Sequence, residues 1–219
     1  MNLFFLAIAP VIAIILYIYV KDTYEKEPVI LLFKNFVYGA TASVFITTIL
    51  GGALSKIFVV TDSSNIIQTL IKAFIVVGLV EELSKYFVVR YYSQSHKEFN
   101  EPFDGIVYAV MVSMGFATIE NILYVYKFGA QTGIIRAFTA VPAHATFAIL
   151  MGYYMGKAKF SIHRKKLNIL GLLAATFFHG TYDFFLFINY KPGISGGAFV
   201  SLIIGFVLAN KAIKNHQKI

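Results

Sequence analysis

The stretch Gly78-Leu79-Val80-Glu81-Glu82-Leu83-Ser84-Lys85 decides the fold, because it sets two adjacent carboxylates inside a long apolar run. The run extends from about residue 66 to residue 92. On insertion scales an ionised carboxylate near the bilayer centre costs about 2.5 to 3.5 kcal/mol. Both carboxylates therefore need partners, and other apolar segments contain the candidates Glu120, His144, His179 and Asp183. We predict a membrane helix bundle arranged to hold these groups together.

Composition supports this fold class. Of the 219 residues, 58% are hydrophobic and 14% are charged, whereas soluble domains carry roughly 25% charged residues. Apolar runs of about 18 to 25 residues recur along the chain, and each is long enough to span a bilayer. We expect an all-α, polytopic bundle of about seven transmembrane helices, forming a single membrane-embedded domain over residues 1–219. Because the chain has no cysteine, disulfides, thiol nucleophiles and cysteine-ligated metals are excluded.

The predicted helices cover about residues 3–20, 30–59, 66–92, 104–128, 134–156, 167–189 and 194–213. The first segment lacks a basic region before its apolar run, so we expect a transmembrane helix there in place of a cleaved signal peptide. Short loops are predicted at residues 129–133 and 190–193.

Lysine and arginine gather in the loops after the first, third and fifth helices and in the C-terminal tail. By the positive-inside rule, the N-terminus is then outside and the C-terminus is cytoplasmic. We expect a multi-pass protein of the bacterial plasma membrane. The net charge of +8 is explained by this topology, and we predict no nucleic-acid partner.

The polar groups of different helices fall at similar depths. With a rise of about 1.5 Å per residue, Glu120, His144 and His179 lie about 12 to 15 Å from the outer ends of their helices. Asp183 lies one turn further out than His179, and the glutamate pair lies nearer to the bilayer centre. We therefore expect one site in the middle to outer part of the membrane.

Glu81 and Glu82 are adjacent, so they point about 100° apart on a helix and have different roles. Lys85 follows Glu81 at a spacing that favours an ion pair. Either Glu81 pairs with Lys85 and Glu82 is the reactive carboxylate, or the reverse holds. The structural alternative is a buried ion-pair network that only fixes helix packing.

His179 and Asp183 have the i, i+4 spacing at which a carboxylate can orient an imidazole and fix its tautomer. Glu120 adds a third carboxylate, one turn after Phe116, whose expected role is packing. His144 is either a second histidine of the site or a core residue. Three other histidines lie in loops or in the tail, and we expect them to be solvated: His96, His163 and His216.

Two hydrolytic mechanisms fit these groups. In one, a glutamate deprotonates water and the histidines stabilise the oxyanion of the attacked peptide carbonyl. In the other, zinc is bound by His144, His179 and either Glu82 or Glu120, and a glutamate acts as the base. The His-Glu-x-x-His sequence of many zinc proteases is absent, as is the Gly-x-Ser-x-Gly of serine hydrolases. The sequence alone leaves the presence of a metal open.

Three motifs resemble those of the PrsW membrane proteases: Glu81-Glu82-Leu83-Ser84-Lys85, Phe116-Ala117-Thr118-Ile119-Glu120 and His179-Gly180-Thr181-Tyr182-Asp183. The flanking segments 101–108, 115–121, 136–144 and 151–154 are also similar to that family, and the resemblance covers about residues 1–215. The family is distantly related to the CAAX prenyl endopeptidases and the bacteriocin-immunity membrane proteins. In that wider group the second motif carries histidine where this chain has Glu120.

The resemblance implies a membrane-embedded endopeptidase of regulated proteolysis in a stress response. It implies that Glu81, Glu82 and His179 are catalytic. It also implies a protein partner, a membrane-anchored anti-sigma factor, which would receive its first, extracytoplasmic cut here before a second intramembrane protease acts. Our reasoning from the residues adds Glu120, His144 and Asp183 to the site.

Two other functions use the same buried groups. A proton-coupled transporter also needs intramembrane glutamate and histidine chains, but we find no internal repeat of the transporter kind. A non-catalytic membrane scaffold would use the charges for packing alone. We prefer the protease.

Overall fold

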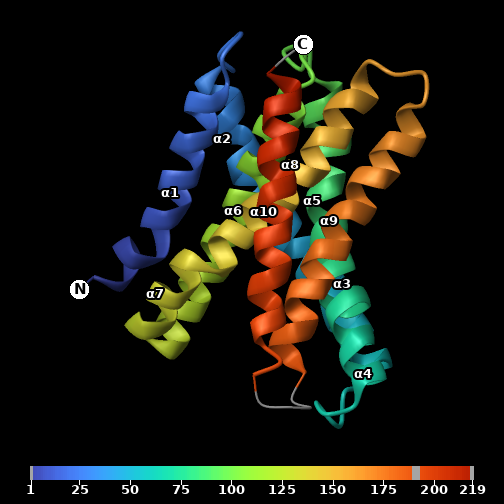
Figure 1. The fold of residues 1–219 in the computed structure, drawn as a ribbon. Coiled ribbons are helices and arrows are strands. Elements are labelled where there is room, and N and C mark those ends of the chain that lie inside the picture. The colour runs from blue at the N-terminus through green and yellow to red at the C-terminus, as the bar shows by residue number, and fades with distance from the viewer. Residues whose placement is uncertain (1, 189–192, 218–219) are drawn as a thin grey trace.

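The computed structural model describes residues 2–188 and 193–217, and all regular elements in this part of the chain are helices. They are α1 Leu3–Lys21, α2 Val29–Tyr38, η1 Gly39–Ser43, α3 Val44–Ile57, α4 Ile66–Ile71, η2 Lys72–Leu79, α5 Val80–Tyr91, η3 Ser93–Ser95, α6 Asp104–Phe128, α7 Ala130–Phe138, α8 Ala140–Lys159, α9 Arg164–Phe187 and α10 Gly196–His216. Figure 1 shows the long helices running side by side.

Six helical stretches of the described chain are long and apolar enough to cross a membrane: Leu3–Lys21, Val29–Ile57, Asp104–Phe128, Ala130–Lys159, Arg164–Phe187 and Gly196–His216. A further long helix is formed by α4, η2 and α5 together. It has the length of a membrane span but contains Lys72, Glu81, Glu82, Lys85 and Arg90. The predicted all-α membrane bundle is confirmed, and the predicted number of about seven helices is close to the six stretches found.

Boundaries differ most around residue 129. The predicted loop over residues 129–133 is wrong, because α7 begins at Ala130. Gly129, with φ 87°, ends α6, and the second break lies at Thr139, between α7 and α8. Gly133 remains helical because a bare backbone lets α7 approach α1, where a Cβ at this position would lie 2.6 Å from a methyl carbon of Leu6. The other predicted loop, residues 190–193, and the predicted end of the sixth helix at residue 189 fall almost wholly outside the described residues.

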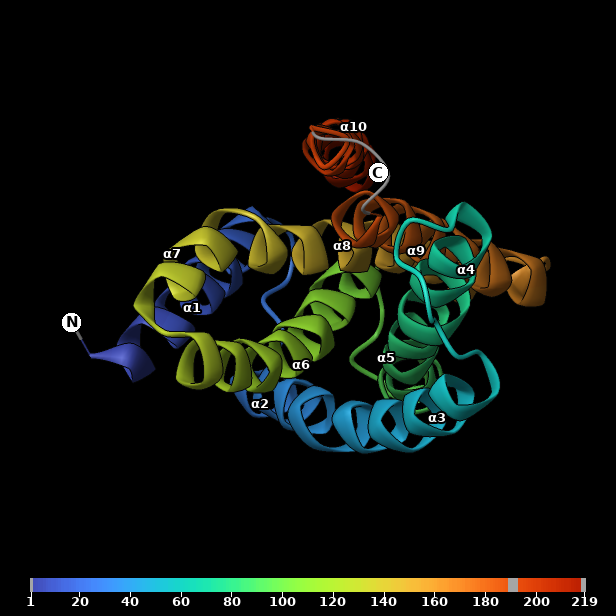
Figure 2. The same cartoon turned by 90° about the horizontal axis from the view of Figure 1, so that it is seen from below.

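The central helix is α6, in which residues 104–118 are all buried among neighbouring helices (Figure 2). Its first turn crosses α8 at a pair of glycine contacts. A Cβ on Gly105 would lie 2.4 Å from the carbonyl oxygen of Gly152 and 2.5 Å from the nitrogen of Gly156. Small residues let membrane helices approach this closely and pack by van der Waals contact. The crossing fixes α6 and α8 against each other, and these two helices carry Glu120 and His144.

Two π-helical segments interrupt the α-helices. One of them, η2, directly precedes the glutamate pair, and the other, η1, packs beside α5. Ser43 of η1 donates a hydrogen bond to the backbone carbonyl of Ser84 at 3.3 Å. Single-turn π segments are rare and are often found at functional sites. Here they flank the turn that presents Glu81 and Glu82.

His216 lies in α10, which runs past the predicted end at residue 213. The expectation of a solvated side chain is wrong for this residue, because its ring is buried and stacks on Tyr153 with 4.5 Å between centroids. His163 is exposed and His96 is half-buried. None of these three histidines contacts the site described next.

Candidate active site

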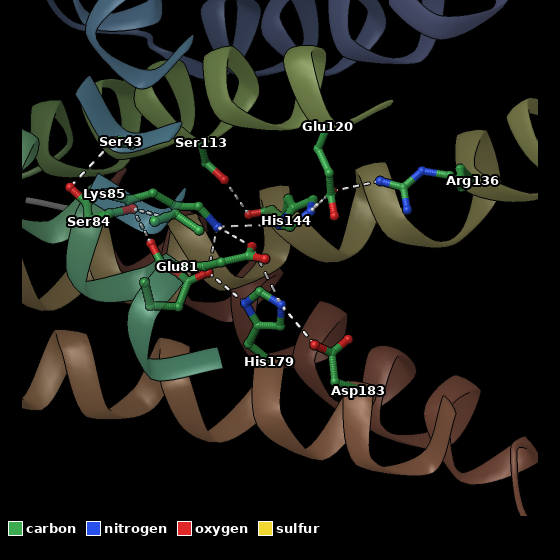
Figure 3. A network of polar contacts seen from close by, with 12 residues as sticks. Ser43, Glu81, Ser84, Lys85, Ser113, Glu120, Arg136, His144, His179 and Asp183 are labelled. Carbon is green, nitrogen blue, oxygen red and sulfur yellow. Dashed lines mark hydrogen bonds and ion pairs between the residues drawn. The ribbon is translucent and has the colours of Figure 1, made fainter. Parts of the chain in front are cut away.

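Four helices bring the six predicted site residues together in one polar network (Figure 3). The glutamate pair comes from α5, Glu120 from α6, His144 from α8, and His179 with Asp183 from α9. Five of these side chains are buried, and Glu120 is half-buried. Residues up to about 100 positions apart therefore converge, as expected of one site.

Glu82 is the orienting carboxylate of the pair. It is fully buried, and its Oε1 accepts a hydrogen bond from Lys85 Nζ at 2.7 Å. The same oxygen lies 2.8 Å from Nδ1 of His179. This contact fixes the imidazole ring and leaves Nε2 facing the other carboxylates, as in sites where a carboxylate holds a metal-binding histidine.

Glu81 is the less engaged carboxylate of the pair: Oε2 of both residues is unpartnered within the described residues, but Glu82 also makes two hydrogen bonds through Oε1. Glu81 Oε2 lies 3.6 Å from Lys85 Nζ and 3.9 Å from Nε2 of His179. A buried oxygen without a partner is costly unless a ligand completes it. Of the two assignments left open by the sequence, the structure therefore has Lys85 closer to Glu82, with Glu81 available for chemistry.

His144 is held from three sides. Its Nε2 lies 2.8 Å from Glu120 Oε2, its Nδ1 lies 3.4 Å from Lys85 Nζ, and its backbone carbonyl accepts a hydrogen bond from Ser113. Because lysine can only donate, this arrangement makes Nδ1 the acceptor and places the ring proton on Nε2, toward Glu120. A metal ligated by His144 would therefore have to replace the long Lys85 contact at Nδ1. The His144 and His179 rings are nearly perpendicular, with 5.4 Å between centroids.

Arg136, from α7, is a member of the site to which sequence analysis assigned no role. Its guanidinium donates to Glu120 Oε2 at 2.6 Å and to Asn121 Oδ1 at 2.8 Å, and it lies over the Tyr124 ring at 4.1 Å. The sequence contains a sign of this role, because the positive-inside rule disfavours an arginine near the predicted outer end of a helix. Arg136 thus holds Glu120, which in turn contacts His144.

Asp183 contacts His179 as its spacing predicts, but at Nε2 and at 3.4 Å. The shorter contact, at Nδ1, belongs to Glu82. Asp183 therefore shares the Nε2 side of the ring with Glu81, and both line the same cavity.

The cavity has a volume of about 690 Å³. Its lining includes five of the six predicted residues, namely Glu81, Glu120, His144, His179 and Asp183, and the sixth, Glu82, is enclosed behind them. The remaining walls come from η2, α7, α8, the C-terminal part of α9 and the start of α10. The site thus lies in a cavity that is shared by helices from most of the chain.

Within the described residues, Glu81, His144 and His179 form a cluster whose ligand atoms lie within 4.8 Å of one another. Two imidazoles and a carboxylate are the donor set of many catalytic zinc sites. The unpartnered Oε2 of Glu81 fits such a role. The carboxylate of this cluster is Glu81, whereas the sequence suggested Glu82 or Glu120; Glu82 is hydrogen-bonded to Lys85, and Glu120 is engaged by Arg136.

The sequence of this chain is similar to those of known membrane proteases. Residues 27–210 match the family described as PrsW family intramembrane metalloprotease. The chain is 38% identical over 194 residues to Protease PrsW of Geobacillus kaustophilus, covering 88% of this chain and 83% of that protein. The corresponding protein of Clostridioides difficile is 39% identical over 201 residues, covering 89% and 83%. That of Bacillus subtilis is 36% identical over 182 residues, covering 82% and 80%.

No solved structure matches the chain. The sequence relatives and the helical fold identify a multi-pass membrane peptidase, which favours the protease over the transporter and the scaffold. The motifs that suggested this resemblance are the same residues that the fold brings into contact. The chain belongs to the PrsW family of intramembrane metalloproteases.

Proposed function

We propose that Glu81, His144 and His179 bind a catalytic zinc ion and that the cavity in front of them cleaves a peptide bond of a membrane-anchored protein. The observation that carries this is the convergence of the three donors within 4.8 Å, with Glu81 lining the cavity and its buried Oε2 left without a hydrogen-bond partner among the described residues. The family's description as metalloproteases supports it. Zinc at such a site acts as a Lewis acid that polarises a carbonyl and acidifies water.

The surrounding residues orient these donors. Glu82 holds the His179 ring through Nδ1, and Lys85 balances the charge of the glutamate pair. Arg136 holds Glu120, which holds His144. Such outer contacts keep reacting groups in position before the substrate arrives, which is where much of an enzyme's rate enhancement originates.

Asp183 is the proton acceptor in this proposal. It lines the cavity beside Glu81, and its hydrogen-bonding capacity is less engaged than that of Glu120, whose Oε2 contacts both Arg136 and His144. A general base needs a free oxygen within reach of the water that it deprotonates. If no metal binds, Glu81 takes this role, because its Oε2 has no hydrogen-bond partner among the described residues.

The substrate that we propose is a membrane-anchored anti-sigma factor, cut on the extracytoplasmic side. The resemblance of the three motifs to PrsW proteases supports this class of partner. The topology inferred from loop charges supports the side of the cut, since it sets α7 and the start of α10 at the outer face. Residues of both elements line the cavity.

The test is cleavage of an anti-sigma factor co-reconstituted in liposomes with purified wild type or with one of the variants Glu81→Gln, His144→Ala and His179→Ala. His163→Ala, in an exposed loop, is the matched control. Zinc content is measured on the same samples. We expect about one zinc per wild-type chain and per control chain, and loss of both zinc and cleavage in the three variants.

If wild type cuts the substrate without bound zinc and Glu81→Gln does not cut it, the metal site is overturned and Glu81 is supported as the base. Undiminished cleavage by all three variants would overturn the site itself. Wild type that cuts other membrane-anchored proteins but no anti-sigma factor would overturn the proposed partner and leave the site standing.

A further inference from the structure

Lys72 is a cation in the wall of the catalytic cavity that the chemistry above does not use. It is the first residue of η2, is half-buried and lines the cavity together with Glu81. Its ammonium lies over the Phe187 ring, 4.7 Å from the centroid. A lysine inside an apolar membrane helix is rare and usually faces a partner or a water-filled cavity.

In the described part of the chain, Lys72 forms no ion pair or hydrogen bond. The residues outside that part carry no side-chain carboxylate that could serve as a partner. The other cation of the cavity wall, Arg136, already pairs with Glu120. Lys72 is therefore the uncommitted positive charge among the described residues of this wall, next to a cavity that receives a polypeptide.

Its position sets a register. Glu81 lies nine positions after Lys72. This spacing corresponds to about 13 Å along an α-helix and to somewhat less in a π-helix. An extended peptide advances about 3.3 Å per residue. A substrate lying extended along η2 with its scissile bond at Glu81 would thus bring a side chain three or four residues away to the ammonium of Lys72.

We infer that Lys72 is a specificity-determining residue that binds an acidic side chain of the substrate, three or four residues from the cleaved bond. The inference rests on the proposed site and deepens it. The matching chemistry is a carboxylate, because an ammonium in a partly desolvated wall gains most from a full opposite charge. The aromatic face of Phe187 holds the ammonium in the absence of substrate.

The experiment uses full-length enzyme in liposomes and a series of membrane-anchored reporter peptides. Each reporter carries Glu, Gln or Lys at one of positions two to five on either side of the expected cleavage site. The measured quantity is the Glu-to-Gln ratio of kcat/KM at each position. Lys56→Met is the matched control, because Lys56 is exposed near the end of α3 and lies outside the cavity wall.

We expect the wild type and Lys56→Met to prefer Glu about 10-fold at one position, as for a close charge pair. In Lys72→Met the ratio should fall to about one, and in Lys72→Glu the Lys reporter should become the best substrate at that position. This inversion is a readout that loss of stability cannot produce. The Gln reporter checks in each variant that the enzyme still folds and cuts.

Two outcomes would overturn the inference while leaving the protease intact. One is a wild type that cuts the reporters without any preference for Glu. The other is a Glu preference that survives in Lys72→Met, which would mean that Lys72 only extends its ammonium toward lipid headgroups. Failure of wild type to cut any reporter would instead count against the proposed function.

Discussion

Two clusters of buried ionisable groups lie along α6, one at its first turn and one in its second half. They offset the cost of burying carboxylates in different ways. The active-site cluster combines Glu81, Glu82, Glu120 and Asp183 with Lys85, Arg136 and two histidines. The second cluster, near the first turn of α6, contains Asp22, Glu27, Asp104 and Tyr108, which are all buried. The first balances anions with cations, and the second relies on neutral donors.

In the second cluster, Asp104 Oδ2 accepts from the backbone nitrogens of Asn100 and Glu101 at 2.8 and 2.7 Å, and Tyr108 donates to Glu27. The nearby Lys26 donates to backbone carbonyls, including that of Asp22. Burial raises the pKa of Glu27 to about 9 and that of Asp22 to about 6. At neutral pH a proton on Glu27 therefore takes the place that Lys85 and Arg136 have in the active site, whereas Asp22 remains mostly ionised.

The comparison teaches that burial alone does not identify a catalytic carboxylate. A carboxylate enclosed by tyrosine and backbone donors serves packing, whereas one that lines a cavity beside two histidines can react. Substitutions at four residues test this distinction, beginning with the largest expected effect.

Glu81→Gln should reduce kcat by about 10³-fold or more, because it removes the carboxylate charge from the cavity wall while preserving the size of the side chain. Cleavage under single-turnover conditions measures the effect. Glu27→Gln, at the other end of α6, is the matched control and should keep most activity. Comparable losses in the two variants would show that the two clusters do not differ in function.

Glu82→Gln should lower zinc affinity and kcat by about 10- to 100-fold, the usual effect of removing a carboxylate behind a histidine ligand. The amide can still accept from one partner but cannot balance the charge of Lys85. Titration of metal-free protein with zinc gives the affinity. A loss of activity at unchanged affinity would assign Glu82 to the reaction itself.

Arg136→Lys should lower kcat/KM by about 10-fold, because lysine keeps the charge but cannot donate to Glu120 and Asn121 at once. Arg136→Met should lower it further, since Glu120 would lose its cationic partner. Thermal unfolding of both variants checks that α7 remains docked. Full activity in Arg136→Met would remove Arg136 from the site.

Glu27→Gln should change how the free energy of unfolding depends on pH, and it should leave catalysis almost unaltered. The folded-state pKa of about 9 lies above the ordinary value of 4.5. The folded state therefore binds the proton more tightly, so the contribution of Glu27 is complete below pH 4.5 and is lost as the pH rises toward 9. The glutamine variant carries no such titration and should lose less stability than wild type between pH 6 and pH 9.5.

Unfolding in detergent at several pH values measures this difference. Glu25→Gln is the control, because Glu25 is an exposed carboxylate in the same loop. Identical pH profiles for wild type and Glu27→Gln would mean that Glu27 is ionised in the folded protein at neutral pH.

Much of this arrangement could be predicted from the sequence, because ionisable groups are so costly in a membrane that each one points to a partner. The bounds of α6, residues 104–128, agree with the prediction, as does the gathering of all six polar residues. The i, i+4 pair His179–Asp183 also makes contact as its spacing requires. These features depend on local periodicity and on a strong solvation penalty, both of which can be read from one chain.

What could not be predicted depends on side-chain direction and on helix contacts. The roles of Glu81 and Glu82 follow from the rotation of α5, which the preceding π segment helps to set. The part played by Arg136 follows from the course of α7, where Gly133 signals a loop by composition but is helical because of its contact with α1. The burial of His216 likewise depends on Tyr153, from a helix distant in sequence.

The glycine crossing of α6 and α8 acts as a pivot for the active site. Glu120 lies 15 residues beyond Gly105 on α6, a lever arm of about 22 Å. A tilt of about one degree at the crossing would therefore shift Glu120 by about 0.4 Å, which approaches the tolerance of about 0.5 Å within which catalytic groups must be held. The accuracy of the catalytic geometry thus depends on how tightly bare backbones touch about 22 Å away along α6.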